Sequence, residues 1–450
     1  MLLTTHVLIK RPKPPSLNFI SYFHKHIKMG WRDEWPSGLD GNQYDGQKLM
    51  DLVRNNKSPF HEVWDVKLLI REIEENLNTQ VTDIPIVDKG SNNYGFYIKA
   101  SNRPDMVARL ARGDVNMPDF DGFPIEKQAP EALFEAATYE LLRSESDIRT
   151  SRLLYYRVPV RHPGPRLTIP LDLTGRRLFV FERAEGTNNM WEDLSAENKL
   201  VLLDQLACMR AALFRYDPPL DFCVKYLHDR IFDFKPESFS VPVAPTREFW
   251  MHVLESKIKA TIQNEGDMIG WEDDAETVGP IALTAKQSLL RAIPHIMPPE
   301  STEVSLYRLI LEHGDFGIHN TSITKDDNGK PLVTSLYDWE TACIVPALLS
   351  DPLVAAGPVD LITDKNGGPS VTRIPKNSSL MDLEMYEMWA QHYIKKLYNE
   401  APDYEIAIRA GKDVRYLWFS LRDWRGGNSE EFFGDLGAWA EKRMKELGVF

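Results

Sequence analysis

The sequence is poor in cysteine and has no long apolar run. Its 450 residues include only three cysteines, Cys208, Cys223 and Cys343, which lie far apart. Such a set builds neither a disulfide framework nor a paired CxxC metal site, and it favours a reducing compartment. No uninterrupted apolar run approaches the ~18 residues that a membrane-spanning helix needs, so we expect no membrane span.

The charge balance is acidic, with 53 Lys and Arg against 66 Asp and Glu, a net charge of −13. This excess argues against a nucleic-acid partner, because that affinity comes from basic side chains that neutralise phosphates. Hydrophobic residues make up 43% of the chain and aromatic residues 10%, which excludes disorder over most of its length. The length predicts two to three domains, or two lobes with additions.

The first 32 residues lack Asp and Glu altogether. A basic, acid-free N-terminus is typical of mitochondrial transit peptides, but this one is short of Arg and Ser and its prolines interrupt any helix. The other interpretation of these residues is a disordered tail, or a stretch that precedes a true start of the protein at Met29. We therefore expect a cytoplasmic protein, with a mitochondrial location as the alternative. The basic residues are Lys10, Arg11, Lys13, Lys25, Lys28 and Arg32.

The rest of the chain predicts a small mixed lobe followed by a large helical one. Short β-prone runs alternate with helical spacing up to residue 182, and helical pattern then dominates as far as Phe450. Ser195 is the expected N-cap of the first long helix of the second part. The expected elements of the first part are a helix over 61–77, strands over 84–88, 94–100, 106–111 and 176–182, and a helix over 131–146 that Pro130 starts.

Three standard motifs fail. Gly90 and Gly95 have the spacing of a P-loop, but Phe96 stands where Lys is required. The sequence HEVWD at His61 lacks the second His of a zinc-protease helix. No G-x-S-x-G nucleophile elbow is present, so an α/β-hydrolase is not indicated.

Residues 311–340 contain a constellation that does indicate chemistry. Asp315 and Asn320 lie five residues apart in a loop, and a hairpin with an Asp-Asn-Gly turn follows. Because a hairpin folds the chain back on itself, Asp338 at its end returns close to Asn320. Carboxylate and amide oxygens suit Mg²⁺, and phosphoryl transfer from ATP needs such ligands beside a carboxylate that orients the attacking hydroxyl.

The pattern H-G-D-x-x-x-x-N, from His313 to Asn320, is followed 18 residues later by D-W-E. It resembles the catalytic core of the aminoglycoside phosphotransferase / choline kinase-like family, small-molecule kinases with a protein-kinase-like fold. The resemblance implies that Asp315 is the catalytic base and that Asn320 and Asp338 hold Mg²⁺ and the nucleotide phosphates. His313 would be structural. His319 departs from the pattern, since many members have Gly there.

The resemblance also assigns roles in the first lobe. The turn that begins with Gly90, Ser91 and Asn92 looks like the family's nucleotide loop, whose backbone N–H groups could cover phosphates. Arg109 occupies the position of the Lys that binds the α- and β-phosphates, and Arg can take this role although the two are not equivalent. Lys99 is the competing candidate, which we interpret as a solvated lysine.

The helix after Pro130 should carry the glutamate that pairs with this cation. Glu135 fits best, because it lies inside the helix beside the buried positions; Glu131 and Glu140 are the alternatives. The family's hinge would run from Glu182 to Gly186, where adenine bonds to the backbone.

Four segments follow from this resemblance. They are an N-terminal extension over 1–60, a nucleotide-binding lobe over 61–182, a hinge over 183–187, and a lobe for catalysis and acceptor binding over 188–450. The expected fold is α+β and bilobal, with a small antiparallel-sheet lobe and a large, mainly helical lobe. A basic N-terminus is also similar to mitochondrial fungal members of the family.

The phosphoryl acceptor is less well indicated. Trp339 and Glu340 stand where a protein kinase has Phe-Gly, and no Ala-Pro-Glu segment follows, which favours a small molecule. Glu340 is a possible neighbour of the metal, and we interpret it as structural. An acidic stretch could attract a cationic acceptor or could be a solvated turn: Glu272, Asp273, Asp274 and Glu276. Aromatic residues could line an apolar acceptor pocket or belong to the core: Trp339, Tyr416, Trp418, Phe419 and Trp424.

The sequence therefore predicts an ATP- and Mg²⁺-dependent phosphotransferase that acts on a hydroxyl of a small molecule. The alternative is a catalytically silent, kinase-like protein that binds nucleotide and serves a binding or regulatory role. The expected partners are a small-molecule acceptor and no nucleic acid, with the oligomeric state left open.

Overall fold

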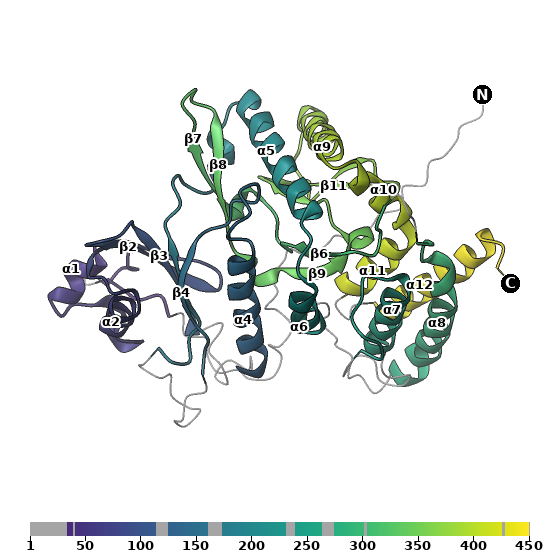
Figure 1. Ribbon diagram of the computed structural model, residues 1–450, viewed down its shortest axis with the longest axis horizontal. Helices are drawn as coiled ribbons and strands as arrows, with labels where there is room; N and C mark the ends of the chain where they lie inside the picture. Colours follow the sequence, from purple (N-terminus) through teal and green to yellow (C-terminus); the bar gives the residue numbers. More distant parts are fainter. Residues whose placement is uncertain are drawn as a thin grey trace.

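The computed structural model describes residues 34–38, 41–113, 125–160, 173–230, 239–262, 274–300, 304–424 and 428–449. A lobe built on a sheet lies at one end of the long axis, and a larger, mainly helical lobe lies at the other (Figure 1). This arrangement confirms the expected α+β, protein-kinase-like bilobal fold.

The smaller lobe is built on a five-stranded antiparallel sheet with the order β1-β2-β3-β5-β4. Along β2, Tyr94, Phe96 and Ile98 are buried while their neighbours are more exposed, the period of two that a strand imposes. The four expected strands are present, β3 with the expected bounds and the other three with shifted ends, and β4 was not anticipated. The strands are β1 (Val81–Lys89), β2 (Asn93–Ala100), β3 (Met106–Ala111), β4 (Leu153–Arg157) and β5 (Leu178–Glu182).

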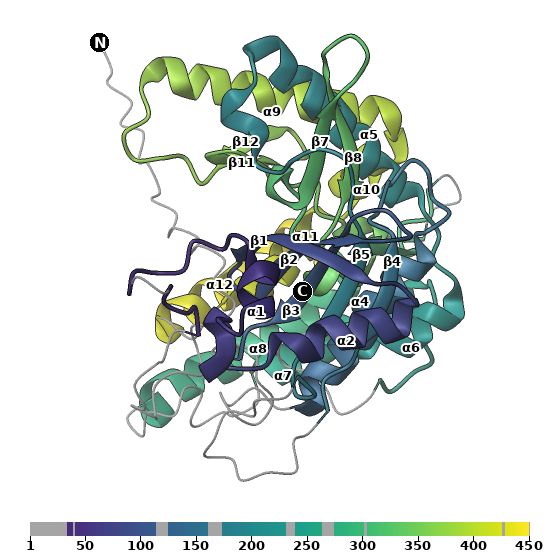
Figure 2. The same cartoon turned by 90° about the vertical axis from the view of Figure 1, so that its left-hand side faces the viewer.

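Helices cover both faces of this sheet (Figure 2). On one face α1 (Leu49–Arg54) and α2 (Val66–Leu77) share a core with β2 and β3, whereas α4 (Ile125–Leu141) packs with the helical lobe and the other face. Two predicted helix starts were wrong. Asp65 caps α2 by accepting the N–H of Lys67, so the helix begins after a short 3₁₀ turn over Pro59–Glu62.

The second wrong start concerns α4, which begins at Ile125 and ends at Leu141. Pro130 lies inside the helix rather than at its first turn. A proline lacks the N–H of one helical hydrogen bond, yet α4 continues through Pro130 from Ile125 to Leu141. The proline signal was therefore misleading here.

Helices make up most of the larger lobe. The predicted N-cap is confirmed, because Ser195 Oγ accepts the N–H of Asn198 at 3.2 Å. The helices are α5 (Ala196–Arg215), α6 (Leu220–Arg230), α7 (Arg247–Thr261), α8 (Asp274–Ile296), α9 (Leu380–Glu400), α10 (Pro402–Ala410), α11 (Lys412–Asp423) and α12 (Ser429–Glu446).

Short strands carry the functional loops of this lobe. The predicted hairpin is present as β7 (Thr321–Lys325) and β8 (Pro331–Leu336), and β6 (Leu309–Glu312) pairs with β9 (Cys343–Pro346). A further three-stranded sheet was not anticipated. Its first strand lies against the loop after β6, through a bridge between Gly317 and Ala355. Its strands are β10 (Val354–Ala356), β11 (Val359–Thr363) and β12 (Pro369–Thr372).

The segment before residue 61 packs into the smaller lobe. Tyr44, Leu49 and Phe60 are buried in the same core as Trp64 and Tyr94. We therefore propose that this lobe begins at Glu34, earlier than the boundary at 61 that the sequence led us to expect. In the part of the chain that the structure describes, no helix has both the length and the apolar character to cross a membrane.

Candidate active site

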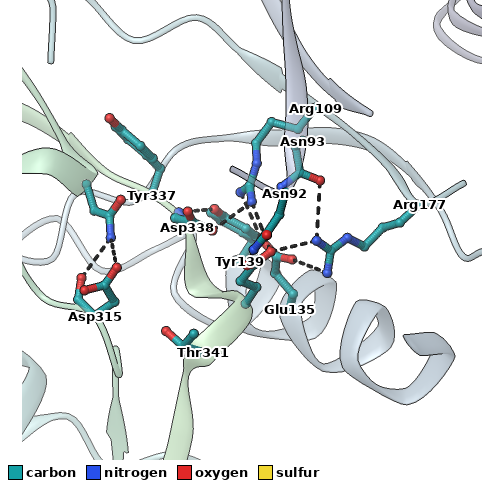
Figure 3. A network of polar contacts seen from close by, with 12 residues as sticks. Asn92, Asn93, Arg109, Glu135, Tyr139, Arg177, Asp315, Tyr337, Asp338 and Thr341 are labelled. Carbon is teal, nitrogen blue, oxygen red and sulfur yellow. Dashed lines mark hydrogen bonds and ion pairs between the residues drawn. The ribbon is translucent and has the colours of Figure 1, made fainter. Parts of the chain in front are cut away.

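A cavity of about 650 Å³ lies between the two lobes. Four parts of the chain line it: the turn between β1 and β2, strand β3, the segment after β5, and the loops on either side of the β7–β8 hairpin. The predicted residues that line it are Gly90, Ser91, Asn92, Arg109, Glu182, Asp315, Asn320 and Asp338. Figure 3 shows the polar network that connects several of these side chains.

The loop that follows β6 positions Asp315. Gly314 has a φ of +80°, and a Cβ at this position would lie 2.1 Å from the carbonyl oxygen of Thr341. Only glycine fits, so this loop and the one after Asp338 approach each other closely. Asn320 Nδ2 donates to the backbone oxygen of Asp315 at 2.9 Å and to its Oδ2 at 3.1 Å. The two side chains are therefore held together.

His319 completes the surroundings of Asp315. Its Nε2 lies 3.0 Å from Asp315 Oδ2, and the carboxylate is 38% exposed. Burial alone would raise the pKa of Asp315, but the hydrogen bond and charge of His319 outweigh burial and lower this pKa below its ordinary value. The same hydrogen bond raises the pKa of His319. Asp315 is thus ionised at neutral pH and accepts hydrogen bonds only.

The hairpin returns Asp338 to the cavity, as the sequence predicted. Thr321 pairs with Leu336 at the base of the hairpin, and the N–H of Tyr337 donates to Asn320 O at 3.0 Å. Asp338 adopts a left-handed conformation with a φ of +68°, and its N–H donates to the Tyr139 hydroxyl at 3.0 Å. Such a conformation in a non-glycine residue has an energetic cost and is commonest at functional sites.

His313 contacts the loop that contains Asp338. It is fully buried, and burial lowers its pKa to about 4, so the ring is neutral at neutral pH. Its Nε2 lies 2.8 Å from the carbonyl oxygen of Tyr337, which can only accept, so Nε2 carries the proton. The loop containing Asp315 and the loop containing Asp338 are therefore joined by one buried histidine.

Arg109 is the cation of the network. Its Nη1 lies 3.1 Å from Glu135 Oε1, and its Nη2 lies 2.7 Å from Asp338 Oδ1 and 3.6 Å from Glu340 Oε2. Lys99, the competing candidate, is half exposed and pairs with Asp83 at 3.7 Å outside the cavity. The predicted position of the cation on β3 is therefore occupied by Arg109.

Glu135 is the glutamate of α4 that reaches Arg109. It is fully buried, and burial raises its pKa to about 7 although Arg109 and Arg177 lower it. The two alternatives point elsewhere: Glu131 lies 3.8 Å from Arg230, and Glu140 lies 3.4 Å from Arg143. The structure thus separates three candidates that helical spacing left open.

Sequence reasoning missed Arg177 and underrated Glu340. Arg177 Nη2 donates to Glu340 Oε2 at 2.6 Å, and Asn92 Nδ2 donates to Glu340 Oε1 at 2.7 Å. Glu340 lines the cavity and connects the turn of the first lobe to the loop of Asp338, whereas we had expected it to be structural. Arg177 precedes a buried strand, and its signal was the rarity of an arginine pair at such a position.

The turn between β1 and β2 lies over the cavity. Gly90 donates its N–H to Asn93 O at 2.9 Å, and a Cβ there would lie 2.9 Å from that same oxygen. On the outer side, Arg112 Nη1 donates to Gly90 O at 2.9 Å and to Ser91 O at 3.0 Å. The turn that the sequence assigned to phosphates is therefore tight and anchored.

The segment after β5 forms the edge of the cavity. The N–H groups of Glu182 and Arg183 are donated to Arg152 O and Asp105 O, and the Glu182 side chain pairs with Arg152 at 3.1 Å. An adenine contact through these two N–H groups is therefore not open. Ala184, which also lines the cavity, offers the next backbone N–H.

The two expectations about the acceptor fare differently. Glu272 and Asp273, and the side chains of Asp274 and Glu276, lie outside the described residues. The aromatic residues do not line the cavity. Trp339 is fully buried against His313 at a ring distance of 4.5 Å, and Trp418 is buried. Phe419 contacts Arg415 and Arg422 in its own helix α11, whereas Tyr416 and Trp424 contact Trp439 and Phe432 of α12.

Asn320 and Asp338 are the residues that could hold a cation. Asn320 Nδ2 is committed to Asp315, so its Oδ1 is the atom left for a metal, and Asp338 contributes a carboxylate to the same cavity. Over the described ranges, no group of three His, Cys, Asp or Glu side chains is arranged for a metal ion. A pair of oxygen ligands fits Mg²⁺, which keeps several waters and takes its other ligands from substrate phosphates.

No family model and no curated protein match this chain. Among solved structures, it is similar to the aminoglycoside phosphotransferase APH(2'')-Ib bound to ADP, with a TM-score of 0.41 and 10% identity over 86% of this chain and 100% of the other. The streptomycin–ATP complex of APH(2'')-IIa gives a TM-score of 0.41 and 11% identity over 86% and 99%. A microcompartment-associated aminopropanol kinase gives 0.33 and 13% over 86% and 99%. Likenesses this distant add nothing to the geometry described above.

Proposed function

We propose that the chain is an ATP- and Mg²⁺-dependent phosphotransferase that moves the γ-phosphate to a hydroxyl of a small molecule. The observation that carries this proposal is the convergence of Arg109, Asp315, Asn320 and Asp338 on one cavity between the lobes. Phosphoryl transfer depends mainly on positioning and on electrostatic stabilisation, and these residue types supply both.

The smaller lobe would bind the triphosphate. The turn at Gly90, Ser91 and Asn92 covers the phosphates, and Arg109 neutralises part of their charge. Glu135 keeps the guanidinium of Arg109 in the cavity, where it is 14% exposed. The segment from Glu182 onward lies at the edge of the cavity, where we expect the hinge between the two lobes.

Asn320 and Asp338 would hold Mg²⁺ through one amide and one carboxylate oxygen. When bound, the cation screens the phosphate charge and favours departure of the γ-phosphate. Asp315 would accept a hydrogen bond from the acceptor hydroxyl and take its proton as the new bond forms. The hydrogen bonds from His319 and Asn320 to Oδ2 leave Oδ1 for this contact.

A small acceptor is favoured over a protein. Strand β9 starts at Cys343, five residues after Asp338, and pairs with β6. After β9 the chain passes directly into a 3₁₀ turn over Ala347–Leu349 and then into β10, so no long loop of the kind with which protein kinases bind a polypeptide substrate lies between Asp338 and β10. The chemical class of the acceptor beyond a hydroxyl, the fungal-type subgroup and the compartment remain predictions of the sequence.

One observation favours the second candidate, a silent nucleotide-binding protein. Arg109 Nη2 lies 2.7 Å from Asp338 Oδ1 and so occupies an oxygen that a cation would use. If this ion pair persisted with nucleotide bound, the protein would bind ATP without transferring phosphate. The metal dependence of binding separates the two functions.

The test is a thermal-shift titration with ATP and ADP, with and without Mg²⁺, followed by a transfer assay with hydroxyl acceptors. A nucleotide at ~100 times its Kd should stabilise the folded chain by about 2.7 kcal/mol. Asp338→Ala should lose the Mg²⁺-dependent part of the shift, and Asp315→Asn should keep it while losing transfer. Asp327→Ala, an exposed carboxylate in the same hairpin, is the control. Full turnover in both site variants would refute the assignment.

Location has its own test. Fractionation of a tagged chain beginning at Met1, beside one beginning at Met29, distinguishes a cytoplasmic from a mitochondrial protein. Recovery of only the longer form in mitochondria would favour the alternative.

A further inference from the structure

Glu34, the first residue that the structure describes, is a buried carboxylate that accepts hydrogen bonds from Arg176, Tyr94 and Gly113. It is 2% exposed. Arg176 donates to it through Nη2 at 2.7 Å and Nη1 at 2.9 Å, the Tyr94 hydroxyl donates at 3.1 Å, and the N–H of Gly113 donates at 2.7 Å. A carboxylate with this number of charge-assisted bonds is held in one geometry and holds its partners in turn.

The partners of Glu34 belong to three segments of the smaller lobe, and Tyr94 lies in β2. Gly113 follows the end of β3, and Arg176 precedes β5. Arg176 Nη1 also donates to Ala111 O at 3.1 Å, and the N–H of Ala111 donates to Arg177 O at 2.9 Å. A Cβ on Gly113 would lie 2.3 Å from Glu34 Oε1, so glycine allows this close approach. Glu34 thus joins the end of β3 to the start of β5.

The residue next to Gly113 and the residue next to Arg176 each contact a group that lines the cavity. Arg112, before Gly113, donates to Gly90 O and Ser91 O and so anchors the turn. Arg177, after Arg176, donates to Glu340 Oε2 at 2.6 Å. Glu34 holds the backbone of Gly113 and the side chain of Arg176, and this limits the positions that the adjacent Arg112 and Arg177 can take.

We infer that Glu34 is a positioning residue for the nucleotide site, through which the N-terminal segment holds Arg112 against the turn and Arg177 against Glu340. The identity of the ligand, a nucleoside triphosphate with its cation, rests on the proposed function. The coupling between Glu34 and the turn rests only on the contacts above. The segment before residue 61 is therefore part of the binding machinery rather than a linker.

A merely structural role would weaken folding without changing the site, and the chain offers a matched control for it. Glu72 in α2 accepts a hydrogen bond from the Tyr155 hydroxyl at 2.9 Å and from Arg157 Nε at 2.7 Å, in the same lobe. Its side chain is 17% exposed and does not line the cavity. Glu72→Gln removes a comparable tyrosine- and arginine-bound carboxylate that has no connection to the turn.

The experiment compares the full chain with Glu34→Gln and Glu72→Gln by apparent melting temperature and by the Kd of ATP with Mg²⁺. We expect Glu34→Gln to raise Kd about tenfold, which corresponds to ~1.4 kcal/mol. Glu72→Gln should lower the melting temperature while leaving Kd within about twofold, or ~0.4 kcal/mol. An unchanged Kd in Glu34→Gln, or an equal rise in Glu72→Gln, overturns the inference.

A second arm does not depend on nucleotide. Backbone hydrogen exchange at residues 90–93 should become faster in Glu34→Gln and stay as in the wild type in Glu72→Gln. If the wild type binds no nucleotide but this difference is seen, the proposed function fails and the positioning role stands. If exchange at the turn is unchanged, the positioning role fails whatever the ligand.

Should Glu34→Gln not fold, the double variant Glu34→Met with Arg176→Met is measured. Replacing both members of a buried ion pair by apolar residues is often neutral for stability. We expect this variant to melt near the wild type while Kd stays raised about tenfold, or ~1.4 kcal/mol. Recovery of the wild-type Kd along with stability would show that the pair serves folding alone.

Discussion

Gly314 offers the sharpest test of how the loop of Asp315 and the loop of Asp338 are held together. Its φ of +80° and the distance of 2.1 Å between an added Cβ and Thr341 O leave no room for a side chain. Gly314→Ala therefore forces the loop of Asp315 away from the 3₁₀ turn that follows Asp338 (Trp339–Thr341). The variant changes neither a charge nor a proposed ligand.

The magnitude has two parts. A left-handed conformation costs a non-glycine residue roughly 1–2 kcal/mol. The contact with a backbone oxygen, which cannot rotate away, adds an overpacking cost of about 1–3 kcal/mol. Gly329→Ala isolates the first part, because Gly329 has a φ of +75° with nothing within 4 Å of the added Cβ. The free energy of unfolding should thus fall by ~2–5 kcal/mol for Gly314→Ala and by ~1–2 kcal/mol for Gly329→Ala.

The consequence for function is larger than that for stability. A displacement of about 1 Å between reacting groups can lower a rate ~100-fold, because transfer requires near-attack geometry. We expect kcat to fall ~100-fold in Gly314→Ala, with the nucleotide Kd little changed, and to stay at the wild-type value in Gly329→Ala. Urea denaturation followed by circular dichroism gives the stabilities, and steady-state transfer gives kcat. Equal losses of stability, or an unchanged kcat in Gly314→Ala, would show that the close approach of the loops does not matter.

Three further outcomes follow from the same network. Mg²⁺ alone should not raise the melting temperature, because Arg109 engages Asp338, whereas Mg²⁺ with ATP should; a rise with the cation alone would contradict this. Burial alone would raise the pKa of Glu34, but the hydrogen bonds and charge of Arg176 hold this pKa below the usual ~4.3. The contribution of Glu34 to the free energy of unfolding should therefore be complete above pH ~4.3 and should be lost as the pH falls further. The stability difference between wild type and Glu34→Gln, measured by urea denaturation from pH 6 to 3, should shrink accordingly. Burial raises the pKa of Glu135 to about 7, so the contribution of this residue to the free energy of unfolding should fall as the pH rises towards 7. At pH 8, Glu135→Gln should therefore unfold at no lower urea concentration than wild type.

The catalytic loops were predictable because their signals are local. A five-residue spacing, a turn of Asp-Asn-Gly and an Asp at the end of the hairpin define the positions of Asp315, Asn320 and Asp338 within a stretch of fewer than thirty residues. Short β-prone runs between turn-forming residues likewise placed β2 and β3, and the family resemblance singled out Arg109 on β3. Helical spacing narrowed the partner of Arg109 only to three glutamates, because Glu131 and Glu140 lie on faces of the same helix next to that of Glu135.

What the sequence did not reveal depends on contacts between distant segments. Arg177 reaches Glu340 across 163 positions, and Glu34 reaches Arg176 across 142. The periodicity of the sequence does not predict such pairs, because a buried ion pair requires only that two opposite charges come together once the lobes have folded. The sheet of β10, β11 and β12 was missed for a related reason, since its strands are three to five residues long and too short for a period of two to be recognised.

The guanidinium of Arg109 has a consequence for the order of binding in the proposed function. A guanidinium offers donors at a fixed angle, so Nη1 bonds to Glu135 while Nη2 bonds to Asp338, and a compact ammonium could not keep the same two contacts in this geometry. Arg109 thus connects helix α4 to Asp338 before any ligand arrives. A cation can use the Asp338 oxygen only when Arg109 turns to a phosphate, and Arg109 turns only when a phosphate is present. Nucleotide and cation should therefore bind together. The phosphate replaces Asp338 as the partner of Arg109, and the cation replaces Arg109 as the partner of Asp338.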